Sequence, residues 1–490
     1  MLGTVARSRP RVVIVGGGVS GLATAFDLHR RVGAAAQLTL VEAGSRLGGK
    51  VVAGQFSGHL VDTGPDAILM RVPALTALLD ELGLSDQIVP QAALGAYIWS
   101  RGKLRRLPAG TMFGVPERLI PLLSSRLLSP TGLARAALDL VLPRRAVPQQ
   151  DLSIAELIVP RLGRQVFDRL VDPLLGGVHA GRAAELSARS TVPEIEALAR
   201  KNRSLYLGLR RLRRHAPPTT GGVVLASLSG GLGRLVAALE ARLGAADLRL
   251  NSTVRRVVRD GGGYRVELAD GTSIAADAVV LATQAFVSAR LLADLAPDAT
   301  TLLEQIPYVD VATVWLAYPR SAVSRPLDGS GFLVPPQEGK LLVGCTWASV
   351  KWPDLADDDL VLIRGMVGRR GDRRWLGMDD EALVRAVHAE LVESMGMTAS
   401  PVDQRIDRWP QAMPQYLVGH RERLDALDAA LRDQPGLYVT GAAYRGIGLA
   451  SCVADAGRVG AIAAQQITTD IARKGPRLAA DDRPSSEVTS

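Results

Sequence analysis

The amino-acid sequence predicts an α/β fold with α+β insertions, and three features near its start carry this prediction. The run 12–15 is short, apolar and β-branched, which is typical of a buried parallel strand. It leads directly into Gly16-Gly-Gly-Val-Ser-Gly21, a G-x-G-x-x-G pattern. A second strand, expected over 37–41, ends at Glu42, which lies 21 residues after Gly21. Together these features predict a Rossmann-type dinucleotide-binding domain.

Each part of this fingerprint has a physical role. Gly16 allows the tight turn, Gly18 lets the backbone approach a pyrophosphate, and Gly21 lets helix and strand pack closely. The helix expected over 23–30 would present free N–H groups and a positive dipole end to the phosphates. Glu42 can accept a hydrogen bond from a ribose hydroxyl. A glycine pattern alone could be a mere turn, but the strand, the helix and the acid favour a dinucleotide site.

The residues after the acid indicate which dinucleotide binds. Glu42-Ala-Gly-Ser-Arg-Leu-Gly-Gly-Lys50 holds Arg46 and a glycine pair that a nicotinamide cofactor does not need. FAD is longer and binds extended, so more backbone must come close to it, and glycine permits that approach. The alternative is a glycine-rich surface loop. We therefore expect FAD as the cofactor.

Composition bounds the other functions. The 490 residues are enough for roughly three domain-sized units. Net charge is +9, and only six of the 58 basic residues are lysine, which favours acidic ligands or an anionic membrane surface. Only 4% of residues are aromatic and no nucleic-acid motif is present, so we expect no nucleic-acid partner.

The location in the cell follows from cysteine usage and hydropathy. Cys345 and Cys452 form no disulfide framework, which fits a reducing cytoplasm. The segment 1–10 lacks the apolar core of a signal peptide, and no run of about 18 apolar residues predicts a membrane span. The six histidines form no ligand cluster, so we expect no metal.

The chain order suggests a cofactor domain built from three separate stretches. The first is 1–83. The second, 216–299, holds expected strands over 253–259, 264–268 and 277–283, and the third, 433–470, holds a strand over 437–440 followed by a long helix. Between them we expect a mainly helical insertion over 84–215 and a substrate-binding domain over 300–432. The polar tail, 471–490, is expected to be disordered.

Several motifs further along the chain point to one family. They are Asp62–Leu69, Leu107–Pro116, Val171–Gly181, Gly344–Trp347 with Lys351–Pro353, Arg408–His420 and Gly441–Cys452. Over residues 11–467 the chain resembles the bacterial porphyrinogen oxidases of the FAD-containing amine oxidase and phytoene desaturase superfamily. One branch oxidises coproporphyrinogen III to coproporphyrin III, and the other oxidises protoporphyrinogen IX. The resemblance implies removal of six hydrogens, with dioxygen reduced to hydrogen peroxide. The flavin N5 carries this chemistry, so no side chain is named as catalytic.

The resemblance adds further contacts to the FAD site. It implies that the cofactor is held by Gly16, Gly17, Gly18, Val19, Ser20, Gly21, Glu42, Ala43, Arg46, Gly49, Lys50, Gly64, Pro65, Asp66, Ala67, Val254, Trp409, Gly441, Ile447, Gly448 and Leu449. The helix after Gly448 would direct its N-terminus at the pyrimidine end of the flavin, where it stabilises negative charge.

On the substrate side the chain departs from the family pattern. Met366 and His179 stand where relatives often have tyrosine, and Ile68 stands where they often have phenylalanine. Arg71 is the candidate for holding a propionate, the alternative being a solvated surface arginine. His179 could equally be a packed histidine. These departures leave FAD binding untouched but open the choice of porphyrinogen.

The resemblance also implies two partners. The basic and apolar stretches 101–106 and 117–145 would contact a membrane surface, the alternative being helices packed on their own domain. A transient contact with the next enzyme of haem synthesis is also implied. Two other functions remain open: an oxidase of amines or secondary metabolites, and a non-catalytic carrier on the same fold.

Overall fold

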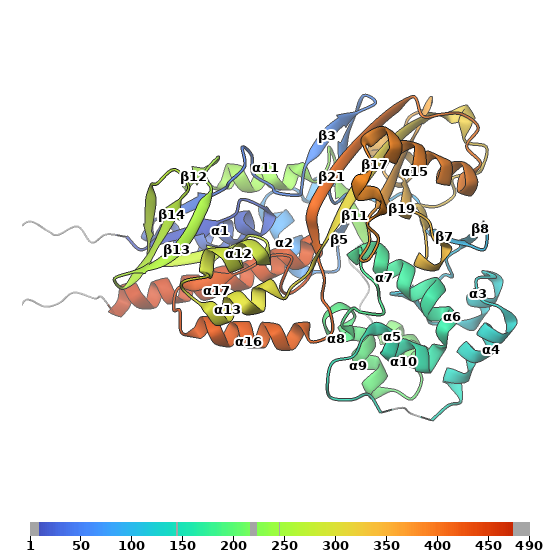
Figure 1. Ribbon diagram of the computed structural model, residues 1–490, viewed down its shortest axis with the longest axis horizontal. Helices are drawn as coiled ribbons and strands as arrows, with labels where there is room; N and C mark the ends of the chain where they lie inside the picture. The colour runs from blue at the N-terminus through green and yellow to red at the C-terminus, as the bar shows by residue number, and fades with distance from the viewer. Residues whose placement is uncertain (1–8, 144–145, 216–222, 245, 474–490) are drawn as a thin grey trace, which may run out of the picture.

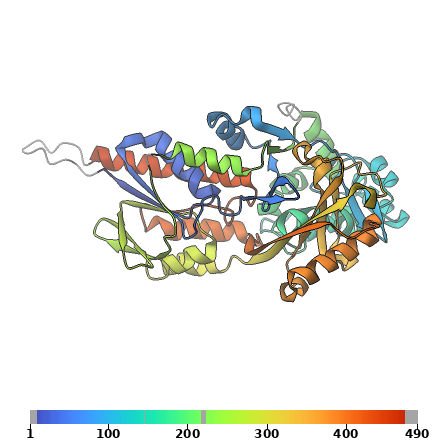
Figure 2. The same cartoon turned by 90° about the horizontal axis from the view of Figure 1, so that it is seen from above.

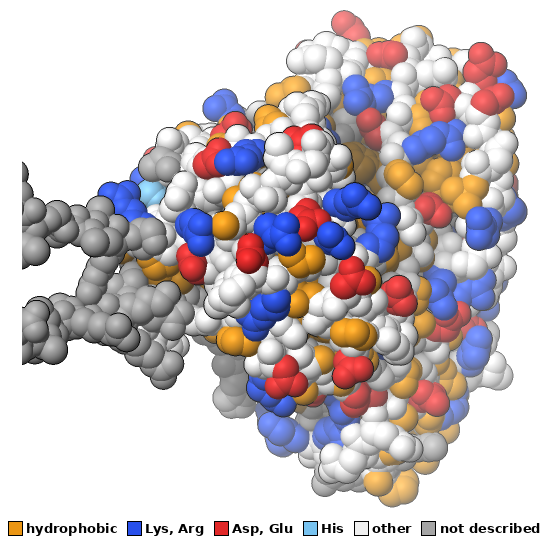
Figure 3. All heavy atoms as spheres, turned by 60° about the vertical axis from the view of Figure 1, so that its left-hand side comes forward, with side chains coloured by type: hydrophobic (Ala, Val, Ile, Leu, Met, Phe, Trp, Pro, Cys, Tyr) orange, Lys and Arg blue, Asp and Glu red, His pale blue; other side chains and the backbone are white. Residues whose placement is uncertain are grey.

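The computed structural model describes residues 9–143, 146–215, 223–244 and 246–473 (Figure 1). The molecule is elongated. A parallel sheet and its helices form one end, and a larger antiparallel sheet with a helical part forms the other. Charged side chains of both signs are interspersed over the face drawn in Figure 3, so the net positive charge is not gathered into one patch there.

A five-stranded parallel sheet organises the first end. Its strands, in spatial order, are β12 (Asp247–Arg249), β2 (Gln37–Val41), β1 (Arg11–Val15), β16 (Ala278–Leu281) and β22 (Leu437–Val439). All neighbouring pairs are parallel. The strands come from three separate stretches of the chain, and the Rossmann-type α/β fold that the sequence predicts is confirmed.

Helices cover both faces of this sheet, as Figure 2 shows. Val12 and Ile14 of β1 pack on one side, whereas Val13 and Val15 pack on the other. The first face is covered by α1 (Val19–Val32), α2 (Pro73–Glu81), α11 (Gly233–Arg242) and α17 (Leu449–Arg473). The second face is covered by α12 (Ala285–Leu292), α13 (Pro297–Glu304), α16 (His420–Arg432) and the meander β13 (Val254–Asp260), β14 (Gly263–Leu268) and β15 (Ser273–Ala276). Burial on both faces explains the unbroken apolar runs of the strands.

The second end is built on a seven-stranded sheet. Its spatial order is β21 (Asp403–Pro414), β17 (Tyr308–Pro319), β20 (Leu360–Val367), β19 (Leu342–Trp347), β18 (Gly331–Leu333), β7 (Tyr97–Ser100) and β8 (Lys103–Arg106). One face packs against α15 (Asp380–Met395), through Val367 and Val387 among others. The opposite face is turned toward the cofactor domain and carries the candidate site.

The helical part lies beside this sheet and has its own apolar core. Its helices are α3 (Leu119–Ser124), α4 (Pro130–Ala137), α5 (Ile154–Leu162), α6 (Arg164–Val166), α7 (Asp172–His179), α8 (Ala188–Thr191), α9 (Pro193–Lys201) and α10 (Leu205–His215). Small elements join the parts: β3 (Ala53–Phe56), β4 (His59–Asp62), β5 (Ile68–Leu69), β11 (Leu225–Leu228) and α14 (Ala348–Lys351).

The stretch 84–215, predicted to be mainly helical, instead holds strands over about its first quarter, residues 84–118. That segment forms β6 (Ile88–Pro90), β7, β8, β9 (Thr111–Met112) and β10 (Val115–Pro116), and α-helices begin only at Leu119. The reason is long-range pairing: β7 lies parallel to β18, with Tyr97 opposite Phe332, and thereby joins the large sheet. Basic side chains on the edge strand β8 hide this pattern in the sequence.

The last described helix, α17, continues to Arg473 and so enters the segment 471–490, for which the sequence predicts disorder. Residues 474–490 lie outside the described residues. None of the helices in the described ranges is long and apolar enough to cross a membrane. Within those ranges no group of three or more His, Cys, Asp or Glu side chains could hold a metal ion.

Candidate cofactor and substrate site

The turn between β1 and α1 has the geometry that a pyrophosphate requires. Gly16 has φ +106°, and a Cβ on it would lie 2.9 Å from the Ala282 carbonyl oxygen. A Cβ on Gly21 would lie only 1.9 Å from the Gly16 oxygen, so strand and helix meet at van der Waals contact. Helix α1 starts after Gly18 with neither a side-chain cap nor an acidic residue in its first turn, where Val19 and Ser20 lie. Its N–H groups and dipole are therefore available to an anion.

The loop after β2 is stacked on this turn. Glu42 accepts the Gly17 N–H on Oε2 and the Gly44 N–H on Oε1, both at 2.7 Å. A carboxylate has about four acceptor positions, so two remain for a ribose. Arg46 donates to the Gly49 oxygen at 2.9 Å, which braces the glycine pair. Ala43 lies between Glu42 and Gly44 in the chain, two residues after the end of β2.

A second loop, 62–67, lies between the cofactor domain and the large sheet. The Thr63 oxygen accepts the Thr313 hydroxyl at 2.9 Å and Trp409 Nε1 at 3.2 Å. A Cβ on Gly64 would lie 1.9 Å from the Lys50 oxygen and 3.8 Å from the Trp409 ring. The structure thus brings Lys50, Gly64 and Trp409 together, although they are far apart in sequence. Burial lowers the pKa of Lys50.

Asp66 anchors this loop with its side chain. Its carboxylate accepts Lys351 Nζ at 3.0 Å and Trp352 Nε1 at 3.1 Å, and Arg364 Nη1 lies 3.1 Å away. Burial raises the pKa of Asp66, but Lys351 and Arg364 more than offset it and hold the pKa well below its usual range. The side chain is therefore engaged by protein groups, and its neighbours Pro65 and Ala67 are held in place with it.

The turn before α17 forms the third wall. Gly441 has φ +129°, and a Cβ on Gly448 would meet no atom within 4 Å, so the backbone of Ile447, Gly448 and Leu449 borders open space. Helix α17 has no acidic residue in its first turn. Two helix N-termini, those of α1 and α17, are thus free of acidic residues in one region of the molecule, and both suit negative charge.

Tyr416 fixes that turn. Its hydroxyl donates to the Ala442 oxygen at 2.7 Å and accepts the Gly446 N–H at 2.9 Å. Its ring stacks on His420, with centroids 4.0 Å apart. His420 Nε2 lies 3.1 Å from the Tyr444 oxygen. The stacked pair therefore holds the turn through three contacts with its backbone.

The substrate-side residues occupy the open face of the large sheet and the helix above it. Met366 is paired with Thr313 and Gly344, and its Cε lies 3.0 Å from where a Cβ on Gly344 would be. Helix α7 crosses this face, where a Cβ on Gly177 would lie 2.9 Å from Leu333. Met366 therefore lies between the loop held by Thr313 and helix α7.

His179 ends α7 and is buried. Burial lowers its pKa to about 4, so the imidazole is neutral at pH 7. Arg71 lies in the connection between β5 and α2. Its guanidinium is 5.4 Å from the Phe113 ring and 4.0 Å from Glu194, and its described contacts include neither His179 nor Met366.

Comparison with known proteins decides the family. The family model for flavin-containing amine oxidoreductases matches residues 19–468. The chain belongs to this family. Similar proteins include the coproporphyrinogen III oxidase of Bacillus subtilis, 33% identical over 91% of this chain and 96% of that protein. That of Propionibacterium freudenreichii is 36% identical over 92% and 90%.

Solved structures agree with this assignment. A structure from Exiguobacterium sp. 255-15 superimposes with a TM-score of 0.84 at 32% identity, over 94% of this chain and 100% of that one. Cyclohexylamine oxidase from Brevibacterium oxydans has a TM-score of 0.67 at 19% identity, over 94% and 100%, which shows the fold alone. The family resemblance and the FAD cofactor predicted from the sequence motifs are thereby confirmed.

The glycine turns and helix ends of this flavin-containing oxidoreductase fit FAD. The backbone at Gly448 has open space beside it, and the first turn of α1 holds no acidic residue that would repel a phosphate. Val254, which the resemblance implies as a cofactor contact, begins β13 and pairs with Leu268. Sequence reasoning missed Tyr416, Lys351 and Arg364, although the first two lie within the motifs that carry the resemblance.

A cavity of about 230 Å³ lies behind the 62–67 loop of the oxidoreductase. Asp62 and Asp66 line it together with Trp315 and Trp352. Asp62 accepts the Leu232 N–H at 3.0 Å, which ties the first stretch of the cofactor domain to the second. Burial raises the pKa of Asp62 to about 7, in contrast to the low pKa of Asp66. The difference arises because Asp66 alone is bonded to cationic side chains.

Proposed function

We propose that this protein is an FAD-dependent oxidase that converts coproporphyrinogen III to coproporphyrin III, with dioxygen as the electron acceptor. The observation that carries the proposal is the 29–36% identity, over nearly the whole chain, to coproporphyrinogen III oxidases of several bacteria. In the structure the sheet face that carries Trp409, Thr313 and Met366 is held against the 62–67 loop, which supports a substrate position between that loop and α7.

The cofactor contacts of the proposal follow from the geometry. The pyrophosphate would lie at the N-terminus of α1 over Gly16–Gly21, and Glu42 would hold the ribose. The loop of Gly64 and the ring of Trp409 would border the flavin, with Ile447–Leu449 at its pyrimidine end. Bound FAD supplies the oxidation that protein side chains cannot perform. The protein positions the ring and excludes competing reactions.

On the substrate side, Met366 and neutral His179 would offer an uncharged wall to the apolar macrocycle. Arg71 would hold a propionate, since its nearest carboxylate, that of Glu194, is 4.0 Å away and leaves donors free. The missing tyrosine hydroxyls suit a mechanism in which the substrate's own pyrrole N–H groups release their protons to solvent. No side chain is assigned as acid or base.

Oxidation of protoporphyrinogen IX is the second candidate. It is favoured by the 30% identity to protoporphyrinogen oxidase 1 of Arabidopsis thaliana, over 90% of this chain and 85% of that protein. The two substrates differ in carboxylates, with four propionates in coproporphyrinogen III and two in protoporphyrinogen IX. Discrimination between them would therefore depend on cationic side chains at the site.

One experiment separates the candidates. The FAD-loaded protein is mixed anaerobically with each porphyrinogen, and flavin bleaching is followed in a stopped-flow instrument. We expect the second-order rate constant of flavin bleaching, the rate constant divided by the substrate Kd, to be at least about tenfold higher for coproporphyrinogen III than for protoporphyrinogen IX. The reason is that cationic groups left unpaired disfavour the dicarboxylate. Admission of air should then produce porphyrin fluorescence and peroxide. A flavin that stays oxidised with both would refute the proposal.

We further propose that the helical part contacts an anionic membrane surface. The observation is the strong exposure of apolar side chains next to arginines: Ile120 is 80% exposed, Leu123 60% and Val141 67%, with Arg118 and Arg126 beside them. We expect the protein to sediment with anionic and not with neutral phospholipid vesicles, and Ile120→Ser with Leu123→Ser to abolish this. Equal sedimentation of wild type and variant would contradict it.

A further inference from the structure

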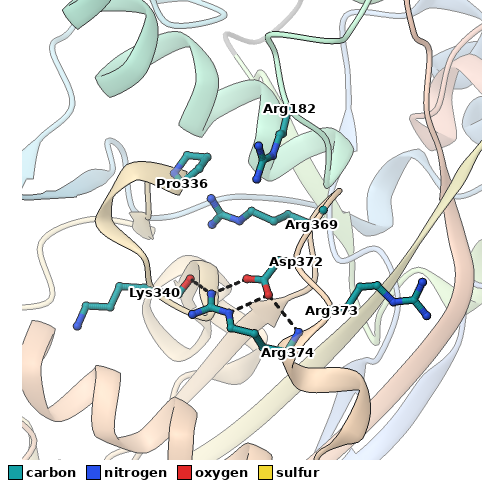
Figure 4. Close-up of a pocket in the computed structure, with 8 residues that line it drawn as sticks. Arg182, Pro336, Lys340, Arg369, Asp372, Arg373 and Arg374 are labelled. Carbon is teal, nitrogen blue, oxygen red and sulfur yellow. Dashed lines mark hydrogen bonds and ion pairs between the residues drawn. The ribbon is translucent and has the colours of Figure 1, made fainter.

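A basic cavity of about 280 Å³ lies at the end of the large sheet, where the turn after α7 meets the loop after β20 (Figure 4). Five basic residues and one acid line it: Arg182, Lys340, Arg369, Asp372, Arg373 and Arg374. We call it the arginine cavity. Arg182 follows the end of the helical part's α7, whereas the 369–374 loop belongs to the large sheet.

Arg369 is a buried cation without an acidic partner. It is only 6% exposed, and its Nη2 donates to the carbonyl oxygens of Val334 at 3.1 Å and Leu342 at 3.2 Å. Its Nε is buried and makes no hydrogen bond, and no carboxylate in the described ranges lies within ion-pair distance. A buried guanidinium in this state is costly unless an anion compensates it.

The carboxylates near Arg369 are engaged by other groups. Asp172 accepts the Ala183 N–H at 2.8 Å. Asp372 binds Arg374 Nε at 2.9 Å, and Arg374 also donates to the Gly339 and Lys340 oxygens. Arg374 is therefore satisfied within the protein, while Arg369 is not.

Arg182 is the second cation with free donors. Its Nε donates to the Arg370 oxygen at 3.2 Å, and no ion pair of its guanidinium is found among the described residues. Gly371 faces it without a side chain, since a Cβ there would lie 3.4 Å from Arg182 Nη2. In Figure 4 the side chains of Arg182 and Arg369 extend into the same space, whereas Arg373 points away from it. Lys340 also turns aside, toward Glu393.

Two guanidinium groups thus converge on one cavity with donors to spare. Their mutual repulsion would be relieved by an oxygen anion that accepts from both, and guanidinium pairs with carboxylate and phosphate in two-donor geometry. We propose that the arginine cavity is a binding site for an oxyanion, a carboxylate or a phosphate group, held between Arg182 and Arg369. This site is additional to the cofactor site. Its binding of phosphate does not depend on the proposed function, whereas a porphyrin carboxylate as its natural ligand rests on that function.

The oxyanion could come from either of two sources, a free phosphate or a carboxylate arm of a larger ligand. The second source is suggested by the positions of Arg182 and Arg369, which each follow a substrate-side residue, His179 and Met366, by three positions. A porphyrin carboxylate and inorganic phosphate present the same oxygen chemistry to a guanidinium pair. The experiment therefore includes both.

The test measures thermal unfolding of the FAD-loaded full chain in inorganic phosphate, with sodium chloride of equal ionic strength as the reference. We expect phosphate to raise Tm in a saturable way, since a ligand that binds the folded state alone stabilises it. Arg182→Gln should weaken the phosphate affinity about tenfold or more, because it removes a charged hydrogen-bond donor. Arg182 is exposed, so this variant does not depend on tolerance of a core change. Arg373→Gln is the matched control and should bind as the wild type does.

Coproporphyrin III then identifies the source. If it displaces phosphate in competition and its binding needs Arg182, the natural oxyanion is a carboxylate arm. If it binds without affecting phosphate, the natural oxyanion is a free anion, and both results support the site. The site is overturned if neither phosphate nor coproporphyrin III stabilises the protein in a manner that Arg182→Gln reduces. Arg369→Gln repeats the test from the buried side of the cavity.

Discussion

Replacement of Gly21 by alanine is expected to abolish FAD binding. The new Cβ would lie 1.9 Å from the Gly16 oxygen and 3.3 Å from the Ala282 Cβ. Both clashes involve rigid groups, so α1 must move away from β1 and the phosphate turn must open. We expect a loss of about 3 kcal/mol in the free energy of unfolding. Flavin absorbance per chain should fall to near zero in the purified variant.

Gly457→Ala is the matched control for this prediction. Gly457 also lies in a helix, α17, but a Cβ there meets no atom within 4 Å and its φ is not in the left-handed region. Alanine should raise the free energy of unfolding by about 0.5–1 kcal/mol, because it is the better helix former. Its flavin content should equal that of the wild type. A similar flavin loss in both variants would mean that the close approach at Gly21 is not the cause.

Replacement of Asp66 by alanine should give the second large effect. The change leaves Lys351 and Arg364 without their shared carboxylate, and their side chains are only 11% and 6% exposed. Removing one partner of a buried charge cluster costs about 3–5 kcal/mol. The 62–67 loop loses its anchor at the same time, so FAD affinity should fall as well. Urea unfolding at neutral pH and flavin titration measure the two effects.

The pH dependence gives this prediction a second readout. The pKa of Asp66 is lowered in the folded state, so its contribution to stability is present above the unfolded pKa of about 4 and is lost as pH falls toward the folded value. The stability gap between wild type and Asp66→Ala should therefore narrow below about pH 4. Asp358→Ala, at an exposed carboxylate of the same region, should show no gap at any pH. A gap that does not change with pH would contradict the ionic role of Asp66.

Local sequence patterns are enough to predict the cofactor half of the protein. The strand over 37–41 is found at those residues, and the phosphate turn with Glu42 is found where the spacing places it. These features depend on residues that lie within about 30 positions of one another, so local sequence patterns are enough to predict them. The residues that follow Glu42 and the motifs further along the chain are enough to indicate a flavin among the dinucleotides.

The remaining features depend on contacts between distant parts of the chain. Nothing near Tyr97 shows that it lies opposite Phe332, and so the local pattern there does not reveal a strand of the large sheet. Likewise nothing near Asp66 in the sequence shows that its carboxylate pairs with Lys351 and Arg364, which lie 285 and 298 residues later. Tertiary pairing overrides local propensity at such positions.

Because the parallel sheet is built from three separate stretches of the chain, it can be completed only late in synthesis. Strand β1 emerges first, yet its neighbour β16 and the edge strand β22 follow some 260 and 420 residues later. At about 5–20 residues per second, the last strand appears roughly 20–85 s after the first. During that interval the apolar run of β1 has no complete sheet to join, and the flavin site lacks the wall that α17 provides. We therefore expect FAD to bind only near the end of synthesis. A chain that stalls before residue 437 would expose aggregation-prone strands and would bind no flavin.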